Sequence, residues 1–597
     1  MDHAEAHAEP AHQPSAVSAS ERSERFTPQK PLGRCDVACL IINKMIGGGI
    51  FVSPSIVAHL TGNKVAALFL WVFGGLYSFC SIYIYLEYGL AWPYNGGEFI
   101  YISKIFPVPP LLFACSFAWA FIAFATSTTN SITFAHYINP NKAEDPDVWF
   151  TKFFACVIVV AVSALHYRFV NIGIAANNLL AVFKVSFLAI LIVGGIVESF
   201  RQGGSLPGLG DYPTQHGTSS VTNYALAILQ VLYSYQGWEN ANYVTSEIRG
   251  EGVEKKRILK AGGLAAITIV VTLYISFNLV LFFVLDLKSI TDSVGNVTAD
   301  YAITVFRSSH ETMASHAIYV CIALAAAGNI IGVSFTRARV NRVIAQHRLI
   351  PFHRFFAKSS KYGTTQWDHL GTPTGGLVLQ ALVTCVTIAC VDPFRTILNL
   401  STYGHAVACL ILGIGVLFIR KRMDQYETKD ADPIGAGYTT PWHFQVMKRP
   451  LIRYLAVIFS TVANAYLIII PFKPTSNPDG THPATPSWVQ PTIVIVVYAI
   501  GAIVALYIIT FVPVLDFRQS TCDIRQNPED RGRFVDYNDR RWIIRYLNLR
   551  GDSRKTVETL FTPRSWENIK ERLLTNDEAK TAQELRQRHP LREVVTG

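Results

Sequence analysis

Long hydrophobic stretches separated by short polar segments cover most of the chain. Twelve of them approach the roughly 20 residues that an α-helix needs to cross about 30 Å of hydrocarbon. They lie at about 37–60, 65–90, 110–137, 149–167, 173–197, 221–247, 260–285, 316–336, 374–391, 396–419, 451–471 and 489–514. The pattern predicts an all-α polytopic membrane protein with twelve transmembrane helices within residues 35–515. The polar ends, 1–34 and 516–597, predict a disordered cytoplasmic N-terminal tail and a cytoplasmic C-terminal tail.

The first and the sixth stretches are interrupted by glycine near their middle. The first contains Gly47-Gly48-Gly49, and the sixth contains Gly237. Backbone groups freed inside a bilayer need a protein-lined cavity, and paired interruptions in two halves of a chain are typical of a transporter's substrate site. Small residues also permit close helix packing, but two matched interruptions favour a binding cavity.

The backbone at these interruptions suits a zwitterion. The N–H groups at the half-helix that begins near Ile50 attract a carboxylate, and the carbonyl groups around Tyr233, which end the other half-helix, attract an ammonium group. An α-amino acid carries both groups. Gln236 and Trp238 are then candidates to contact the substrate's side chain, and ordinary packing is the alternative for the aromatic residues.

Charged residues inside the stretches are functional candidates, because each costs about 2.5–3.5 kcal/mol on insertion scales. Lys184 lies in the middle of the fifth stretch. Two roles stay open for it: a carrier of the coupled proton, or a permanent cation bound to backbone carbonyls of the first stretch. Lys44 and Glu239 flank the two interruptions, and a pair between them would join the broken helices. His405, alone in the tenth stretch, is interpreted as a packing residue.

Composition and charge agree with a membrane protein. Half of the residues are hydrophobic, 16% are charged and the mean hydropathy is +0.28. The net charge is +10, and the basic residues gather in alternate loops. One of these loops follows the eighth stretch, and we assign Arg337 and Arg339 to it. The positive-inside rule therefore places both termini in the cytoplasm, and the partner of these charges is the lipid bilayer rather than a nucleic acid. The triplet beginning at Asn296 falls in an outside loop as a candidate glycosylation site.

Motifs for metal binding or enzymatic catalysis are not found. The chain has no metal-ligand spacing, no HExxH and no GxSxG sequence. We therefore expect no metal, no cofactor and no enzymatic activity.

Several ordered motifs resemble the amino acid–polyamine–organocation superfamily. The segment 46–54 (IGGGIFVSP) resembles its glycine-rich first-span signature, and 85–89 (YLEYG) with 96–101 (GGEFIY) resembles the end of its second span. The segment 235–244 (YQGWENANYV) followed by Glu247 is similar to the sixth span of the L-type amino acid transporter branch. Within that branch, Asn43-Lys44 and the long polar tails are most similar to fungal high-affinity methionine permeases.

This resemblance implies a fold and a site. The fold is a 5+5 inverted repeat with broken helices 1 and 6, plus two extra helices, working by alternating access. The substrate carboxylate would lie on Gly48, Gly49 and Ile50, and its ammonium group on carbonyls near Ile42, Met45 and Tyr233. Tyr233 matches an aromatic gate, and Lys184 matches a lysine of sodium-independent members. Gln236 departs from the small or acidic residue usual in relatives. The full set of expected substrate-binding residues is Ile42, Met45, Gly47, Gly48, Gly49, Ile50, Tyr233, Gln236, Gly237 and Trp238, with Lys184, Lys44 and Glu239 for coupling or gating.

The expected function is a plasma-membrane permease that imports an L-amino acid, such as methionine or another neutral one, with proton coupling. The alternative is a membrane sensor that binds an amino acid without net transport. The loop 139–148 has no cysteine, so no disulfide-linked heavy subunit is expected. Lysines of the tails are candidate targets for ubiquitin ligase adaptors.

Overall fold

The computed structural model describes residues 31–106, 111–138, 148–202, 221–250, 252–293, 297–306, 311–359, 372–390, 394–422, 444, 446–472 and 488–511. Nearly all of the two predicted tails, the candidate glycosylation site at Asn296 and the loop 139–147 lie outside these residues.

The described residues are mostly helical, with one isolated bridge between Leu32 and Ile248 as their only β-type pairing. The first half contains α2 (Arg34–Met45), α3 (Gly49–Thr61), α4 (Lys64–Ala91), α5 (Glu98–Ile105), α6 (Leu112–Phe124), α7 (Thr128–Tyr137), α8 (Val148–Arg168) and α9 (Val170–Gln202). The second half contains α10 (Val221–Tyr235), the 3₁₀-helix η2 (Asn240–Glu247), α11 (Gly252–Val284), α12 (Leu287–Asp292), α13 (Val297–Phe306), α14 (Glu311–Gln346), α15 (His353–Phe356), α16 (Thr374–Cys390), α17 (Phe394–Gly415), η3 (Val416–Phe418), α19 (Pro450–Ile469), η4 (Ile470–Phe472) and α20 (Val489–Phe511).

The lengths of these helices support a polytopic membrane protein. Within the described residues, nine helices are long and apolar enough to cross a membrane, and α2 with α3 adds a tenth span if this bent pair counts as one. Each of the twelve expected stretches contains helix, but α10 and α16, with 15 and 17 residues, fall below a spanning length on their own. The third stretch is divided into α6 and α7 at Ala125–Ser127, which the hydrophobic pattern did not predict.

Local sequence explains where the helices turn. Gly62 ends α3 with a left-handed φ of +61°, a conformation that glycine adopts without steric cost. Asn63 then begins α4, and its side chain accepts a hydrogen bond of 2.9 Å from the Ala66 N–H. This cap satisfies one of the donors that a helix start leaves without an intrahelical acceptor.

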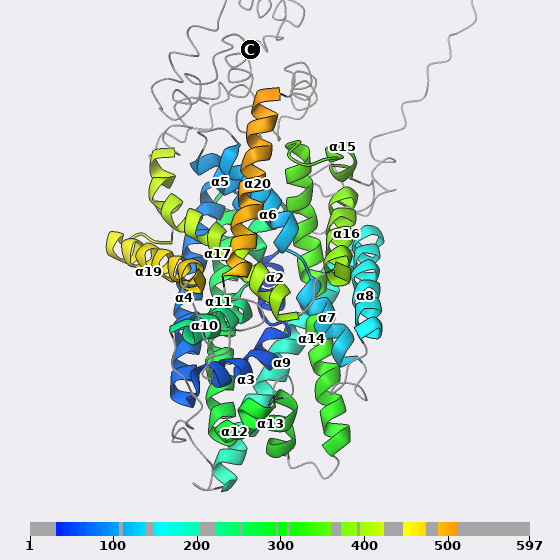
Figure 1. Ribbon diagram of the computed structural model, residues 1–597, viewed down its shortest axis with the longest axis vertical. Helices are drawn as coiled ribbons and strands as arrows, with labels where there is room; N and C mark the ends of the chain where they lie inside the picture. Colours follow the sequence, from blue (N-terminus) through cyan, green and yellow to red (C-terminus); the bar gives the residue numbers. More distant parts are fainter. Residues whose placement is uncertain are drawn as a thin grey trace, which may run out of the picture.

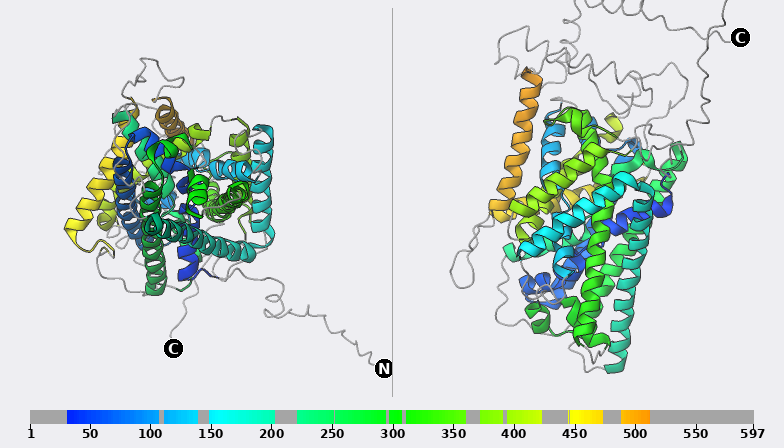
Figure 2. Two further views of the ribbon diagram at one scale, coloured as in Figure 1. Left: turned by 90° about the horizontal axis from the view of Figure 1, so that it is seen from below. Right: turned by 90° about the vertical axis from the view of Figure 1, so that its right-hand side faces the viewer.

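The bundle has a buried centre and an apolar outside. In Figure 1, α2 lies in the middle, α5 and α15 lie toward one end, and α12 and α13 lie toward the other. Figure 2 gives two further directions, with α20 standing at the edge of the bundle. The outer helix α8 exposes Trp149 and Phe153, which are 83% and 63% accessible. Large apolar side chains that face outward on many helices fit contact with lipid rather than water.

The candidate substrate cavity

The first interruption separates α2 from α3 by a bend of 41°. The helix ends at Met45, and Ile46 leaves the helical region with a ψ of 83°. Glycines at the break also allow close contact: a Cβ atom at Gly47 would lie 2.7 Å from Oδ1 of Asn130, and one at Gly48 would lie 2.7 Å from Cγ2 of Thr133. Glycine is a weak helix former, so the triplet both loosens the helix and lets α7 approach its backbone.

The second interruption lies against the first. The helix α10 ends at Tyr235, and a turn leads to η2. Gly237 in this turn has a φ of +151°, a conformation that other residues rarely adopt. A Cβ atom on Gly237 would lie 2.6 Å from Cγ and 2.8 Å from the backbone nitrogen of Met45. The two glycine breaks therefore meet at the centre of the bundle.

Most backbone groups at the first break already have partners. The Gly48 N–H donates to Oδ1 of Asn130 at 3.1 Å. At the end of α2, the Lys44 carbonyl accepts from Nδ2 of Asn329 at 2.5 Å, and the Met45 carbonyl accepts from the Tyr274 hydroxyl at 2.7 Å. The N–H groups of Gly49 and Ile50 lie in the first turn of α3, ahead of any intrahelical acceptor. They are the donors that remain for an anion.

A cavity of about 40 Å³ opens between the two breaks. It has room for about three or four water molecules, which is comparable to the charged end of an amino acid. Its lining residues are Lys44, Met45, Gly47, Gly49, Thr126, Thr129, Asn130, Tyr233, Ser234, Gln236, Asn329, Val333, Arg337 and Ser401.

The predicted substrate residues divide into two groups. Those on the wall of the cavity are Met45, Gly47, Gly49, Tyr233 and Gln236. Those behind the wall are Ile42, Gly48, Ile50, Gly237 and Trp238, all of them buried. Trp238 packs against Tyr77 and His405, with ring centroids 5.6 Å apart in both pairs.

Lys44, predicted for coupling or gating, also lies on the wall, as does Ser234 of α10. The remaining lining residues come from α7, α14, α17 and the break between α6 and α7, and none of them entered the predicted site. One signal was available: Thr126-Ser127-Thr128-Thr129-Asn130 is a run of five polar residues in the middle of the third apolar stretch.

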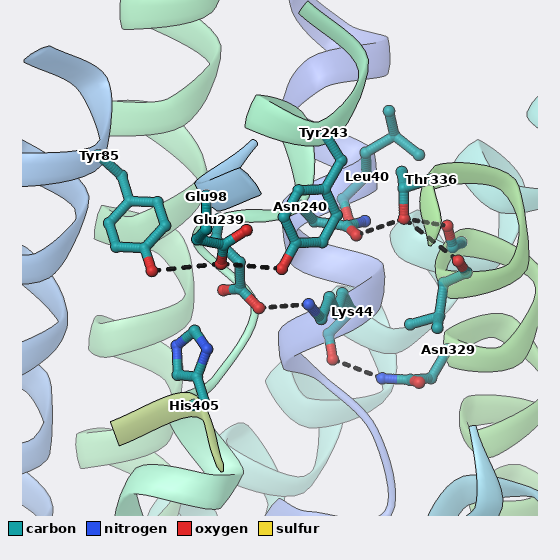
Figure 3. A network of polar contacts seen from close by, with 12 residues as sticks. Leu40, Lys44, Tyr85, Glu98, Glu239, Asn240, Tyr243, Asn329, Thr336 and His405 are labelled. Atoms are coloured by element: carbon teal, nitrogen blue, oxygen red, sulfur yellow. Dashed lines mark hydrogen bonds and ion pairs between the residues drawn. The ribbon is translucent and has the colours of Figure 1, made fainter. Parts of the chain in front are cut away.

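Lys44 and Glu239 form an ion pair that joins the two interrupted segments (Figure 3). Their side chains are 5% and 0% exposed. The Lys44 ammonium also lies 5.1 Å from the centroid of the Tyr243 ring, at a distance suitable for a cation–π contact. The pair considered from the sequence alone is thus present, and it neutralises both charges next to the cavity.

Lys184 holds the last turn of α2 from the opposite side. This buried side chain on α9 donates to the Asn43 carbonyl at 2.8 Å. The Asn43 amide in turn donates to Oδ1 of Asn177 at 2.9 Å and to the Gly328 carbonyl at 2.8 Å. A cation at the carbonyl end of a helix is electrostatically favourable, so Lys184 ties α9 to the broken helix.

Polar contacts join the segments that flank α2 and η2. Glu247, at the end of η2, forms a buried ion pair with Arg339 of α14. Its carbonyl accepts from the Leu32 N–H at 2.9 Å, and the Leu32 carbonyl accepts from the Arg249 N–H at 2.9 Å. The segment before α2 is thus fastened to the segment after η2.

The assignment of Arg337 and Arg339 to a loop was wrong. The helix α14 continues to Gln346, so both residues lie within it, and each is only 5% exposed. The apolar window ends near residue 336 because the charges lower the hydropathy there, although the helix does not end. Arg337 instead belongs to the wall of the cavity.

Comparison with known proteins identifies the family of this chain. The high-affinity methionine permease of Saccharomyces cerevisiae is 26% identical over 483 residues, covering 80% of this chain and 78% of the yeast protein. The low-affinity methionine permease of the same yeast is 24% identical over 415 residues, covering 68% and 73%. The Asc-type amino acid transporter 1 of Mus musculus is 29% identical over 333 residues, covering 53% and 58%. The model of the family described as amino acid permease matches residues 32–515, and the chain therefore belongs to the amino acid permease family.

Proposed function

We propose that this integral membrane protein is a proton-coupled permease that imports a neutral L-amino acid across the plasma membrane. The observation that carries the proposal is the meeting of two glycine-broken helices at a small polar cavity. Membership of the amino acid permease family supports amino acid transport as such. The geometry supports alternating access as the proposed mechanism: a site enclosed by half-helices would open to one side when one half-helix moves.

The proposed fold has twelve spans. Helices α2 to α9 make up the first five and α10 to α17 the inverted second five, with α19 and α20 as the two additional spans. The described breaks fall in the first span of each half, as such a repeat requires. Basic residues at the end that carries α5 and α15, such as Lys104 of α5 and Arg354 of α15, support cytoplasmic termini.

The proposed binding mode uses the backbone groups at the two breaks. The substrate carboxylate lies on the N–H groups of Gly49 and Ile50, and Gly48 joins them when Asn130 releases its hydrogen bond. The ammonium group lies on carbonyls at the ends of α2 and α10, near Met45 and Tyr233, and replaces donors that they now accept from, such as the Tyr274 hydroxyl at Met45 and the Gln236 N–H at Tyr233. Methionine is the first substrate to test, because two relatives are named methionine permeases.

Two residues hold the breaks in position in this proposal. Lys184 acts as a fixed cation on the Asn43 carbonyl, in the position where a sodium ion would otherwise stabilise the end of α2. The Lys44–Glu239 pair keeps the two broken segments together while the substrate is enclosed. Tyr233 is the gate on the wall of the cavity.

The test is uptake into proteoliposomes that contain the purified protein. With pH 5.5 outside and pH 7.5 inside, labelled methionine should accumulate above its external concentration, and a protonophore should abolish the accumulation. Competition with unlabelled amino acids then defines the substrate range. Saturable binding without accumulation would favour the sensor, which the comparisons do not support. Accumulation only against preloaded amino acid would favour an exchanger.

A further inference from the structure

A buried carboxyl group beside the main cavity has no role in the function proposed so far. Glu98 is the first residue of α5 and is 1% exposed. The backbone turns sharply in front of it, since Gly97 has a φ of +50°. A Cβ atom on Gly97 would lie 2.4 Å from Cδ1 of Tyr243. This close packing fixes the carboxyl group inside the bundle.

The Glu98 carboxyl group is only half satisfied. Its Oε1 accepts from the Tyr243 hydroxyl at 3.0 Å and from the Tyr85 hydroxyl at 3.2 Å (Figure 3). Its Oε2 is buried without a hydrogen-bond partner among the described residues. Glu98 also forms no ion pair among the described residues. The nearby cation Lys44 pairs with Glu239 instead. An ionised carboxylate in such a place is much more costly than a neutral carboxyl group.

Glu98 and the substrate cavity share a wall. A second cavity, of about 30 Å³, is lined by Glu98 and His405. It has Gln236, Arg337 and Ser401 in common with the first cavity. The two spaces are therefore neighbours, and a change of charge on Glu98 acts on groups that line the substrate cavity.

Arg337 is the shared residue that responds to such a change. It is 5% exposed, and its Nε and Nη1 atoms have no hydrogen-bond partner in the described residues. A buried guanidinium group with free donors binds a carboxylate wherever it can reach one. The carboxylates near it in the protein are Glu239, which is paired with Lys44, and Glu98. Glu98 is thus the nearby carboxylate without a cation of its own, and the carboxylate of a bound amino acid would be a further partner.

The environment favours protonation of Glu98 near neutral pH. Glu98 lies outside the apolar spans, between Lys64–Ala91 and Leu112–Tyr137. Burial, followed by the neighbouring Glu239 carboxylate, raises the pKa of Glu98 to about 7. The titratable and charged groups that face Glu98 from the packed elements are Lys44 of α2, Tyr85 of α4, Tyr101 of α5, Glu239 and Tyr243 at η2, Arg337 of α14, His405 and Cys409 of α17, and Tyr498 of α20.

We propose that Glu98 binds the transported proton and that Arg337 links its protonation to substrate binding. The inference rests on the proposed function, because it assigns the proton of that transport cycle to one residue. Facing an acidic exterior, the carboxylate takes up one proton, and Arg337 is free for the carboxylate of the amino acid. Facing the cytoplasm, Glu98 gives up the proton and attracts Arg337, and the amino acid leaves. One zwitterion and one proton cross per cycle, so transport carries one positive charge inward.

The test compares wild type with Glu98→Gln, which keeps the shape and an acceptor oxygen but cannot ionise. For a group of pKa about 7, the protonated fraction falls from about 97% at pH 5.5 to about 9% at pH 8. Wild-type initial uptake should therefore fall about tenfold between these pH values, and uptake by Glu98→Gln should change less than twofold. The variant should lose uphill accumulation but retain counterflow exchange, which needs no net proton movement.

Matched variants make the outcome decisive. Glu254→Gln makes the same chemical change at an exposed carboxyl group, 55% accessible, and should keep the tenfold response, as should His405→Asn. If Glu98→Gln is inactive in counterflow, Glu98→Asp, which retains a titratable group, must restore uphill accumulation. Three outcomes would overturn the inference. They are uphill accumulation by Glu98→Gln, a loss of uphill accumulation in Glu98→Asp, and a pH response that is abolished by His405→Asn rather than by Glu98→Gln. A wild type without proton-driven uptake would refute the proposed coupling itself.

Discussion

Breaking the ion pair between Lys44 and Glu239 should lower the free energy of unfolding by more than breaking an exposed ion pair does. Both side chains are almost fully buried, so removing one partner leaves an uncompensated charge away from water. Such losses amount to about 3–5 kcal/mol. We therefore expect Lys44→Met to lower the free energy of unfolding by about that amount and to abolish uptake. The double variant Lys44→Met/Glu239→Met should regain at least about 2 kcal/mol, because an apolar pair leaves no buried charge.

The assay is a double-mutant cycle on the purified protein. Unfolding is followed by circular dichroism as the mole fraction of SDS in mixed micelles increases, for wild type, both single variants and the double variant. The exposed pair Arg249–Glu254, with 3.6 Å between its charged atoms and side chains 63% and 55% accessible, provides the control cycle and should couple by less than about 1 kcal/mol. A coupling energy for Lys44 and Glu239 as small as that of the control would refute the reasoning.

Three other substitutions test separate contacts of the site. Gly48→Val should abolish uptake at near-normal surface expression, because even a Cβ atom would lie 2.7 Å from Thr133; unimpaired uptake would exclude carboxylate binding there. Lys184→Ala leaves the Asn43 carbonyl without its donor, at a cost of about 1–3 kcal/mol, so uptake should fall while its pH dependence persists; a flattened pH profile would make this lysine the proton carrier. Arg339→Gln removes the buried ion pair with Glu247 at the end of η2. Cysteines introduced on the cytoplasmic side should then react faster with a thiol reagent, and unchanged reaction rates would show that the ion pair does not close the protein at the η2 end.

The two breaks could be predicted from the sequence because their cause is local. Three glycines in succession, and one glycine in a left-handed conformation at Gly237, disfavour a continuous helix in any surroundings. The hydrophobic stretches also located the helices well, since apolar length is itself the requirement for a span. The short helices α10 and α16 mark the limit of this approach: each stretch was recognised, but the length of helix within it depends on packing.

The walls of the cavity depend on contacts between distant segments, and the sequence predicted fewer of them. Asn130 of α7 and Asn329 of α14 form hydrogen bonds with the backbone at the first break. No spacing of residues along the chain predicts these contacts. The polar run 126–130 lies at the division of the third stretch, but the prediction treated that stretch as one continuous apolar helix. The run did not indicate which other helix it would face.

Arg337 shows why charge alone misleads near the end of a span. A hydropathy window treats an arginine as the start of a loop, and the positive-inside rule then counts it as a cytoplasmic charge. Here the helix continues for nine residues beyond it, to Gln346, and the guanidinium group lies between two cavities. A charge kept inside the bundle is costly unless it has a partner for at least part of the cycle. The described residues leave two of its nitrogens without a hydrogen-bond partner, so the group is suited to an anion that enters the cavity. In the proposed cycle, an amino acid's carboxylate and an ionised Glu98 take this role in turn.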